Sequence, residues 1–266
     1  MTKIAAIQMC SSEDIEENLQ TARDLIQEAA QKGAKLIALP EMFPLVTYQE
    51  EKRLFLSEPF GRGKIQDFLA KMAKQYGIYL VGGTIPIQAG SSKNYAACLV
   101  YDDQGQCMAQ YNKIHLFDVV LSSTESYRES ATIQAGEGSV VVNTPFGRLG
   151  LAVCYDVRFP ELFNEFFAKG AQIIVLPSAF TVKTGEAHWH VLTRARALDT
   201  FSYVLAPAQG GTHASGRKTY GHSVIVDPWG TIIAEGSPNH TEIIYADIDL
   251  SEVERVRKAI PIGDYK

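Results

Sequence analysis

Cys154 stands where an apolar segment of the chain gives way to polar residues. The run 149–153 is apolar, Cys154 follows it directly, and a helix is expected to begin near Phe159 and Pro160. A nucleophile on such a strand-to-helix turn is exposed at a sheet edge and faces backbone N–H groups left over by the turn. This position favours a catalytic thiol; a buried structural residue is the ordinary alternative for a free cysteine.

The three other cysteines, Cys10, Cys98 and Cys107, have no comparable setting and are interpreted as packing residues. None of the four forms a CxxC pair, so the sequence favours neither a zinc site nor a disulfide framework. This usage is typical of a reducing, cytoplasmic compartment.

Lys113 comes at the end of a predicted strand and is followed by apolar residues. Lysine is seldom buried unless it is paired, so a carboxylate or a thiolate is expected nearby. Beside a thiol, its charge would favour the thiolate and later stabilise an anionic tetrahedral intermediate. The alternative is a lysine whose stem is buried and whose ammonium reaches solvent.

Glu41 follows the apolar run 36–40. The carboxyl ends of strands are where open α/β folds place their chemistry, so a glutamate there could act as a general base. A helix-capping or solvent-facing acid is the alternative. The spacing of Glu41, Lys113 and Cys154 along the chain does not by itself show whether they meet.

The histidines lack the clustered spacing of a metal site, and no motif for a bound nucleotide is present. A Cys/His dyad that uses His115 or His222 stays open, although nothing in the sequence places either beside Cys154. The sequence therefore predicts neither a metal nor a cofactor. The histidines considered are His115, His188, His190, His213 and His222.

The elements that must position these residues alternate between helix and strand, with hairpins mixed in. Strands are predicted at 2–9, 35–39, 78–85, 95–101, 106–111, 139–143, 148–153, 172–176, 203–208, 223–226, 231–234 and 242–248, and helices at 15–32, 64–76, 161–169, 188–200 and 252–258. No linker or repeat interrupts them. This pattern predicts one α/β domain over residues 1–266, in which helices cover mixed sheets.

The amino-acid composition limits the classes of binding partner that are expected. Hydrophobic residues make up 46% and charged residues 21% of the 266 residues, and the net charge is −5. The acidic balance argues against nucleic acid or an anionic membrane as the main partner. No apolar stretch approaches the ~20 residues that cross a bilayer, and the N-terminus does not resemble a signal peptide.

Three segments, at 39–41, 111–116 and 153–161, together resemble the nitrilase superfamily of carbon–nitrogen hydrolases. The resemblance implies a four-layer α-β-β-α sandwich that assembles as a homodimer or a larger homo-oligomer. It places the Glu-Lys-Cys triad of the family on Glu41, Lys113 and Cys154, and a second glutamate on Glu129. A plain loop acid is the alternative for Glu129.

The resemblance also implies a mechanism, in which Glu41 takes the thiol proton and the thiolate attacks an amide carbon. Lys113 and the backbone N–H of Tyr155 would stabilise the oxyanion, and water would hydrolyse the thioester. Two further residues are predicted to bind substrate. Arg158 would hold a carboxylate, with a salt bridge to Asp156 or Glu161 as the alternative, and Phe180 would pack on the substrate chain, with core packing as the alternative.

Segments at 176–180, 184–189, 194–197, 206–213 and 220–223 resemble the deaminated glutathione amidases. These hydrolyse the amide of the α-keto analogue of glutathione, and ω-amidase, which acts on α-ketoglutaramate, is the related alternative. The loop 118–127 departs from both patterns, and such loops often shape substrate pockets. Another carbon–nitrogen hydrolase and a catalytically idle interaction protein are the remaining hypotheses.

Overall fold

The computed structural model describes residues 1–47, 49–90, 92–123 and 125–262, and two six-stranded sheets form the centre of this part of the chain. The first sheet has the order β16-β1-β2-β3-β4-β5, with bounds Glu242–Ile248, Thr2–Gln8, Leu36–Ala38, Tyr79–Gln88, Asn94–Tyr101 and Cys107–Asn112. The second has the order β15-β14-β11-β10-β9-β8, with bounds Ile232–Glu235, Val224–Val226, Tyr203–Ala206, Ile173–Val175, Gly147–Leu151 and Val140–Thr144.

Each sheet has three parallel strands at its centre and antiparallel strands outside them. The parallel sets are β1-β2-β3 and β9-β10-β11. Parallel neighbours end at the same edge of a sheet, so the segments after β2 and β9 emerge where functional side chains commonly gather in α/β folds.

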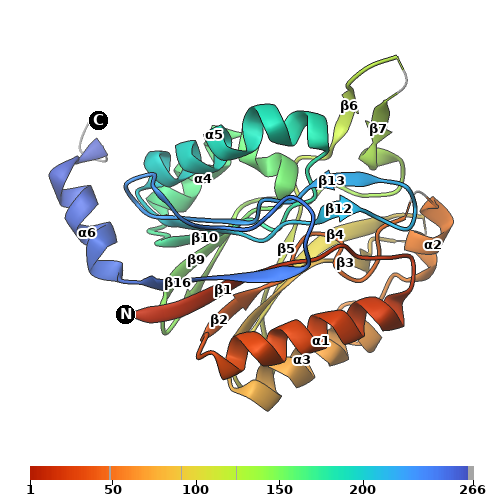
Figure 1. The fold of residues 1–266 in the computed structure, drawn as a ribbon, viewed down its shortest axis with the longest axis horizontal. Coiled ribbons are helices and arrows are strands. Elements are labelled where there is room, and N and C mark those ends of the chain that lie inside the picture. Colours follow the sequence, from red (N-terminus) through yellow and green to blue (C-terminus); the bar gives the residue numbers. More distant parts are fainter. Residues whose placement is uncertain (48, 91, 124, 263–266) are drawn as a thin grey trace.

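Helices cover the outer face of each sheet (Figure 1). Helices α1 (Ile15–Gln31) and α3 (Lys64–Tyr76) lie on the first sheet, and α4 (Pro160–Ala168) and α5 (Val182–Thr200) lie on the second. Asp14 caps α1 by accepting the backbone N–H of Glu16, and Gly77 ends α3 in the left-handed conformation that a glycine adopts without strain. The predicted α-β-β-α sandwich is confirmed.

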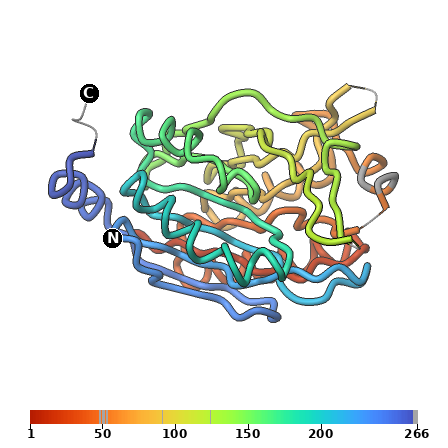
Figure 2. Tube along the Cα trace, turned by 90° about the horizontal axis from the view of Figure 1, so that it is seen from above, coloured from red at the N-terminus to blue at the C-terminus, as the bar shows by residue number. Residues whose placement is uncertain are grey.

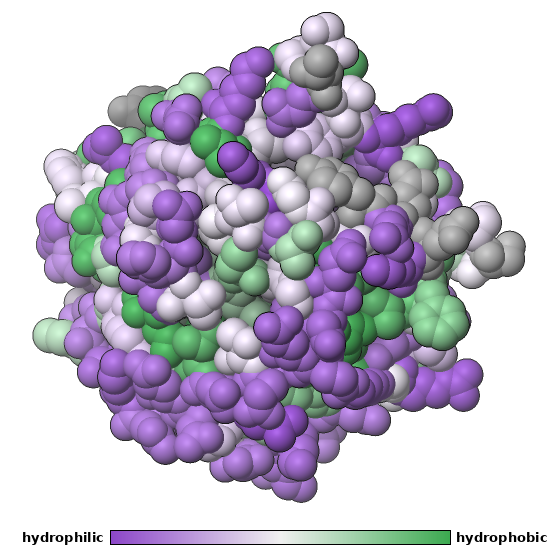
Figure 3. Space-filling model, turned by 45° about the vertical axis from the view of Figure 1, so that its right-hand side comes forward, coloured by the Kyte–Doolittle hydropathy of each residue, from purple (hydrophilic) through white to green (hydrophobic). Residues whose placement is uncertain are grey.

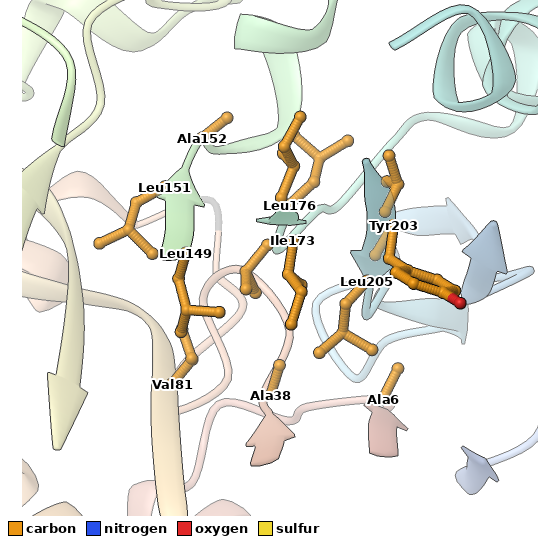
Figure 4. Packing of buried hydrophobic residues seen from close by; sticks show 14 of the residues in the cluster. Ala6, Ala38, Val81, Leu149, Leu151, Ala152, Ile173, Leu176, Tyr203 and Leu205 are labelled. Carbon is orange, nitrogen blue, oxygen red and sulfur yellow. The ribbon is translucent and has the colours of Figure 1, made fainter. Parts of the chain in front are cut away.

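The two sheets pack face to face through apolar side chains of the central strands. Because side chains alternate along a strand, Ala6, Ala38 and Val81 point toward the second sheet, whereas their neighbours Ile37 and Leu80 pack under α1 and α3. Figure 4 shows Leu149, Ile173 and Leu205 of the second sheet, among others, facing those three small residues. A dry interface of this kind fixes the two sheets relative to each other.

Most predicted elements are confirmed, but α5 begins at Val182, six residues before the predicted start at residue 188. Thr181 is the N-cap, and its side chain accepts the backbone N–H of Thr184. The first residues of α5 include Gly185, and glycine has a low helix propensity. The start of the helix is therefore not recognisable from the sequence. The early start brings Thr184 beside Thr181, at one wall of the pocket described below.

Five short elements were not predicted. Strands β6 (Asp118–Val120) and β7 (Ser126–Arg128) form a hairpin in the segment predicted as the loop 118–127, of which residue 124 lies outside the described part. Strands β12 (Gly210–Thr212) and β13 (Lys218–Tyr220) form a second hairpin, and α2 (Glu50–Phe55) is a short helix before α3. Strands of three residues are too short to show alternation in a sequence.

The interpretation of Cys107 as a packing residue is wrong. Cys107 is exposed at the start of β5, the edge strand of its sheet, whereas Cys98 on the neighbouring β4 is buried. Cys10 is half-buried, and its Sγ lies 3.9 Å from Nδ1 of His213.

The C-terminal helix α6 (Leu250–Ala259) extends from one end of the sandwich, near the N-terminus (Figures 1 and 2). Over the residues that the structure describes, no helix is both long and apolar enough to cross a membrane. One domain over residues 1–266 stays a prediction, and residues 48, 91, 124 and 263–266 of that range lie outside the described part.

Candidate active site

Glu41, Lys113 and Cys154 meet at one edge of the sandwich although they come from two sheets. Glu41 lies three residues after β2, Lys113 directly follows β5, and Cys154 lies three residues after β9. Nζ of Lys113 is 3.0 Å from Oε1 of Glu41, and the thiol of Cys154 donates a hydrogen bond to Glu41. All three side chains are buried, so these charges interact far more strongly than they would in water.

Lys113 is held between two carboxylates. Its Nζ lies 2.9 Å and 3.1 Å from the two carboxylate oxygens of Glu129, in addition to the contact with Glu41. Burial lowers the pKa of Lys113, but the negative charges of Glu129 and Glu41 outweigh it, and the pKa is raised well above its ordinary value. Lys113 therefore keeps its charge and brings a fixed cation to the thiol.

Glu129 is fixed in turn by a backbone group. It begins a short 3-10 turn, η1 (Glu129–Ala131), and its Oε2 accepts the backbone N–H of Phe117 over 2.7 Å. The carboxylate of Glu129 thus orients Lys113 without contacting the sulfur in any hydrogen bond that the structure describes.

Cys154 is the first residue of a 3-10 turn, η2 (Cys154–Arg158), and has a φ of 47°. This left-handed conformation costs a non-glycine residue about 1–3 kcal/mol, and it persists only where its surroundings impose it. Here the backbone N–H of Cys154 donates to the carbonyl of Pro177 over 3.0 Å. The first N–H groups of such a turn have no partner within it, which leaves the amide of Tyr155 suited to an oxyanion.

The pKa of Cys154 is raised well above its ordinary value. Burial is the main cause, and the negative charge of Glu41 adds to it, while Lys113 and a hydrogen bond from the backbone of Ala179 act in the opposite direction. The resting group is therefore a thiol that donates to Glu41. Lys113 acts toward the thiolate, as predicted, but burial and Glu41 outweigh its effect on the pKa of Cys154.

Asp156 organises the turn that carries Cys154. Its buried carboxylate accepts hydrogen bonds from the hydroxyl of Tyr111 (2.7 Å), the backbone N–H of Val153 (2.8 Å) and the backbone N–H of His115 (3.0 Å). Nδ1 of His115 also lies 2.7 Å from Oδ1, and the ring of His115 stacks on Phe159. His115 is thus part of the support of the turn, and the described contacts give it no hydrogen bond to Cys154.

A pocket opens above the three residues. In the space-filling view of this end of the molecule, several hydrophobic patches lie between hydrophilic side chains (Figure 3). The pocket is lined by Glu41, Met42, Lys113, Phe117, Ser126, Tyr127, Arg128, Glu129, Thr132, Cys154, Tyr155, Ala179, Phe180, Thr181, Thr184 and Arg217. Of the residues predicted to bind substrate, Tyr155 and Phe180 are among them.

Arg158 lies behind this wall. Its Cζ is 5.6 Å from the ring centroid of Phe180 and 5.8 Å from that of Tyr155, and its Nη2 lies 3.1 Å from Nδ1 of His188. The described contacts include no ion pair from Arg158 to either acid proposed as the alternative. Arg158 supports two lining residues, and its role toward substrate stays a prediction.

Sequence reasoning did not find Ala179, Arg217 and Tyr127. Ala179 acts through its backbone, which side-chain patterns do not reveal. Tyr127 lies on β7 and Arg217 directly precedes β13. The strands of these two hairpins are too short to show an alternation of apolar and polar residues in the sequence. The Pro-Ser-Ala-Phe run around Ala179 was the available signal for that wall.

The fold also gathers His190, His222 and Glu235 outside the pocket lining. Oε1 of Glu235 lies 2.9 Å from Nε2 of His190 and 2.8 Å from Nδ1 of His222. Sequence spacing gave no sign of this cluster because its members come from α5, from a position two residues before β14 and from β15. His222 is therefore paired with the carboxylate of Glu235, and the described contacts give it no hydrogen bond to Cys154.

Comparison with known proteins agrees with this geometry. The family described as carbon-nitrogen hydrolase matches residues 3–258. The chain belongs to this family. A deaminated glutathione amidase of Synechocystis is 39% identical over 262 residues, 97% of this chain and 95% of the relative. An omega-amidase NIT2 of Xenopus tropicalis is 38% identical over 271 residues, 98% of this chain and 93% of the relative.

The crystal structure of Saccharomyces cerevisiae Nit3, described as a member of branch 10 of the nitrilase superfamily, has a TM-score of 0.89. It is 35% identical and covers 99% of this chain and 96% of its own. The predicted membership of the nitrilase superfamily is thus confirmed, and so is the prediction of an enzyme that hydrolyses carbon–nitrogen bonds. In a carbon–nitrogen hydrolase, a thiol, a carboxylate and a buried ammonium in contact supply a nucleophile, a base and an electrophile.

Proposed function

We propose that this carbon–nitrogen hydrolase is a cysteine-dependent amidase that cleaves the amide of a small 2-oxo acid. Deaminated glutathione is the first candidate substrate and α-ketoglutaramate the second, as the names of the two relatives suggest. One observation carries the reaction type: the thiol of Cys154 donates to Glu41 while Nζ of Lys113 lies 3.0 Å from the same carboxylate.

In the proposed reaction, Glu41 takes the thiol proton as the sulfur of Cys154 attacks the amide carbon. The carbonyl oxygen becomes an oxyanion, which Lys113 and the backbone N–H of Tyr155 stabilise. Glu41 then passes its proton to the leaving nitrogen, the C–N bond breaks, and a thioester with Cys154 remains. A water molecule, deprotonated by Glu41, attacks the thioester, and the carboxylate product leaves as the thiol re-forms.

A raised pKa at Cys154 suits this sequence. A thiol that is protonated at rest and hydrogen-bonded to its base delivers its proton as the C–S bond forms, so no exposed thiolate has to persist. Lys113 keeps its charge throughout because two carboxylates surround it. Glu129 acts on the reaction only by positioning Lys113.

The two candidate substrates share the acyl part and differ in the leaving group. Hydrolysis of α-ketoglutaramate releases ammonia, and hydrolysis of deaminated glutathione releases the amine part of the peptide. Both yield α-ketoglutarate, so one assay of that product compares them. We expect Cys154→Ala to abolish turnover of both.

The deciding experiment incubates the purified protein with each amide and follows α-ketoglutarate and, for the second substrate, ammonia. Turnover of deaminated glutathione at the higher kcat/KM supports the first candidate. If neither amide is hydrolysed while Cys154 is intact and can be alkylated, the substrate proposal is wrong, and nitriles and carbamoyl amines become the substrates to test. A Cys154→Ala protein that keeps its full function in the cell would point to an interaction protein.

We further propose that the chain is a single domain that pairs with a second copy and acts in the cytoplasm. Support for pairing comes from the outer face of α5, where Val191 is 68% exposed and Leu198 41% exposed. The neighbouring Trp229 is 55% exposed, and Arg194 holds its turn to α5 by donating to the carbonyl of Gly230. Exposed apolar side chains grouped in this way are typical of an interface.

A further inference from the structure

Arg217 brings a cation into the wall of the pocket. It lies in the turn of the β12–β13 hairpin, directly before β13, and its side chain is half-buried. Its sequence neighbours indicate no role for it, because the hairpin has no recognisable pattern in the sequence. An arginine in the wall of a substrate pocket requires a reason, since burial of a guanidinium without an anion costs free energy.

The described contacts of Arg217 are weak for a guanidinium. Nη1 lies 3.9 Å from Sδ of Met42, Nη2 lies 3.5 Å from the carbonyl oxygen of Ala179, and Cζ lies 5.7 Å from the ring centroid of Tyr127. Nε is buried and has no hydrogen-bond partner. No carboxylate in the described part of the chain pairs with it, so the N–H donors on Nη1 and Nη2 have no charged partner and can bind a ligand.

The other two cations of the pocket wall have different surroundings. Lys113 is bound by Glu41 and Glu129, so its own charge is already compensated. Arg128 is exposed to solvent and stands opposite Asp118 in the register of the β6–β7 hairpin. Among the described lining residues, Arg217 is thus the half-buried cation that has no ion pair with a carboxylate.

The hairpin that carries Arg217 is firmly held. The carbonyl of Arg217 accepts the backbone N–H of His213 over 2.8 Å. His213 is buried, with Nδ1 2.8 Å from the carbonyl oxygen of Ser11 and Nε2 2.7 Å from Oγ1 of Thr219. These contacts fix the backbone of Arg217 relative to the first sheet. A guanidinium whose backbone is fixed can present two parallel N–H donors to the two oxygens of a planar carboxylate.

We propose that Arg217 binds the carboxylate of the acyl part of the substrate and thereby selects amides of dicarboxylic acids over neutral amides. The inference rests on the proposed function, because it names the group that the same pocket recognises. Arg217 is a specificity-determining residue in this proposal, whereas bond cleavage belongs to Cys154, Lys113 and Glu41.

Its neighbours indicate the acyl part. Arg217 contacts Met42, which follows Glu41 in the chain, and Ala179, whose backbone donates to the sulfur of Cys154. The acyl group stays on that sulfur as a thioester while the amine leaves. A carboxylate held by Arg217 would keep the thioester in place for attack by water, which an anchor on the departing amine could not do.

The test compares α-ketoglutaramate with its neutral methyl ester at the carboxylate. For the native protein we expect a higher kcat/KM with the acid. In Arg217→Met, KM for the acid should rise about tenfold to a hundredfold with a smaller change in kcat, because charge-assisted hydrogen bonds are lost, while the ester should be hardly affected. Arg217→Lys should recover part of the preference, since it keeps the charge and loses the fork.

Arg158→Met is the variant for comparison, because the sequence predicts that Arg158 holds a carboxylate, whereas the structure places it against Phe180 and Tyr155 outside the pocket lining. A preference for the acid that survives in Arg217→Met, or that Arg158→Met removes instead, would overturn the proposal. A fall in kcat/KM of Arg217→Met that is confined to deaminated glutathione would also overturn the proposal, since Arg217 would then bind the carboxylate of the leaving group.

A binding measurement separates failure of this inference from failure of the proposed function. In a Cys154→Ala background, calorimetry should detect binding of α-ketoglutarate to the protein and strongly reduced binding when Arg217→Met is added. If the native protein hydrolyses neither amide, the substrate proposal fails, and this titration still decides on Arg217. Equal binding with and without Arg217→Met contradicts the inference whatever the activity.

Discussion

Cys154 is at once the nucleophile proposed here and a thiol whose pKa is raised. Burial and Glu41 raise that pKa, and Lys113 opposes them. At the scale of residues, reactivity therefore depends on proton transfer to Glu41 more than on the thiolate present at rest. The same carboxylate has two opposite effects on the sulfur, and a substitution can separate them.

Glu41→Gln separates these two effects. The substitution removes a negative charge, so by electrostatics alone the pKa of Cys154 would fall and alkylation by iodoacetamide would speed up. If Glu41 is the base, we expect slower alkylation at pH 7 and at least a hundredfold loss of kcat. Mass spectrometry follows each cysteine, and the exposed Cys107 is the internal reference. Faster alkylation of Cys154 in the variant would show that Glu41 does not act as its base.

Lys113→Met should affect catalysis and stability together. Loss of one oxyanion donor costs about 3 kcal/mol of barrier, roughly a hundredfold or more in kcat. It also leaves Glu41 and Glu129 buried without their cation, which destabilises the fold by about 3–5 kcal/mol. Urea unfolding measures the second effect and steady-state kinetics the first.

The double variant Lys113→Met/Glu129→Gln tells the two effects apart. Removal of one of the two carboxylates should restore part of the free energy of unfolding, whereas kcat should stay low because the cation is still missing. Recovery of kcat along with stability would mean that Lys113 only maintains the fold.

At the scale of elements, β3 positions Glu41 through a close backbone approach. A Cβ at Gly83 would lie 1.9 Å from the carbonyl oxygen of Pro40, so glycine is required there. The N–H of Met42 donates to Oγ1 of Thr84 over 2.9 Å, and Nε2 of Gln209 donates to the carbonyl of Glu41 over 3.1 Å. The carboxylate of Glu41 is thus positioned by β3, a strand of its own sheet, and by Gln209, which follows β11 of the second sheet.

Gly83→Ala should therefore displace the Pro40–Glu41 backbone and lower kcat by at least tenfold. Gly82→Ala is the control on the same strand, because its Cβ would meet only the side chain of Leu69, which can move. Both substitutions should cost about 1–3 kcal/mol of stability through overpacking. Thermal unfolding and kinetics are measured on each, and equal kcat values in the two variants would contradict this account.

At the scale of the whole molecule, the apolar face of α5 should determine association. Val191→Lys together with Leu198→Lys should shift the protein toward the monomer in analytical ultracentrifugation, because two desolvated charges oppose burial of that face. Phe55→Lys, on α2 at another part of the surface, is the control and should leave the association unchanged. A native protein that sediments as a monomer at all concentrations would contradict the proposed pairing.

The sequence by itself determined the family and most of the fold. The long elements were predictable because their periodicity extends over many residues: α3 was predicted with its observed bounds, Lys64–Tyr76, and the hairpin of β4 and β5 from its polar turn. The motifs around Glu41, Lys113 and Cys154 were short but occurred together in one order. A catalytic residue can be predicted in this way when its type and its position after a strand are enough to indicate its role.

Only the tertiary structure decided which groups face one another. The raised pKa of Cys154 results from burial and from Glu41, which comes from the other sheet, so no local pattern could reveal it. The same holds for Arg217: its sequence neighbours are those of an ordinary turn, and its meaning comes from the pocket into which the hairpin places it. Burial and long-range proximity are properties of the folded chain, because residues far apart in the sequence create them.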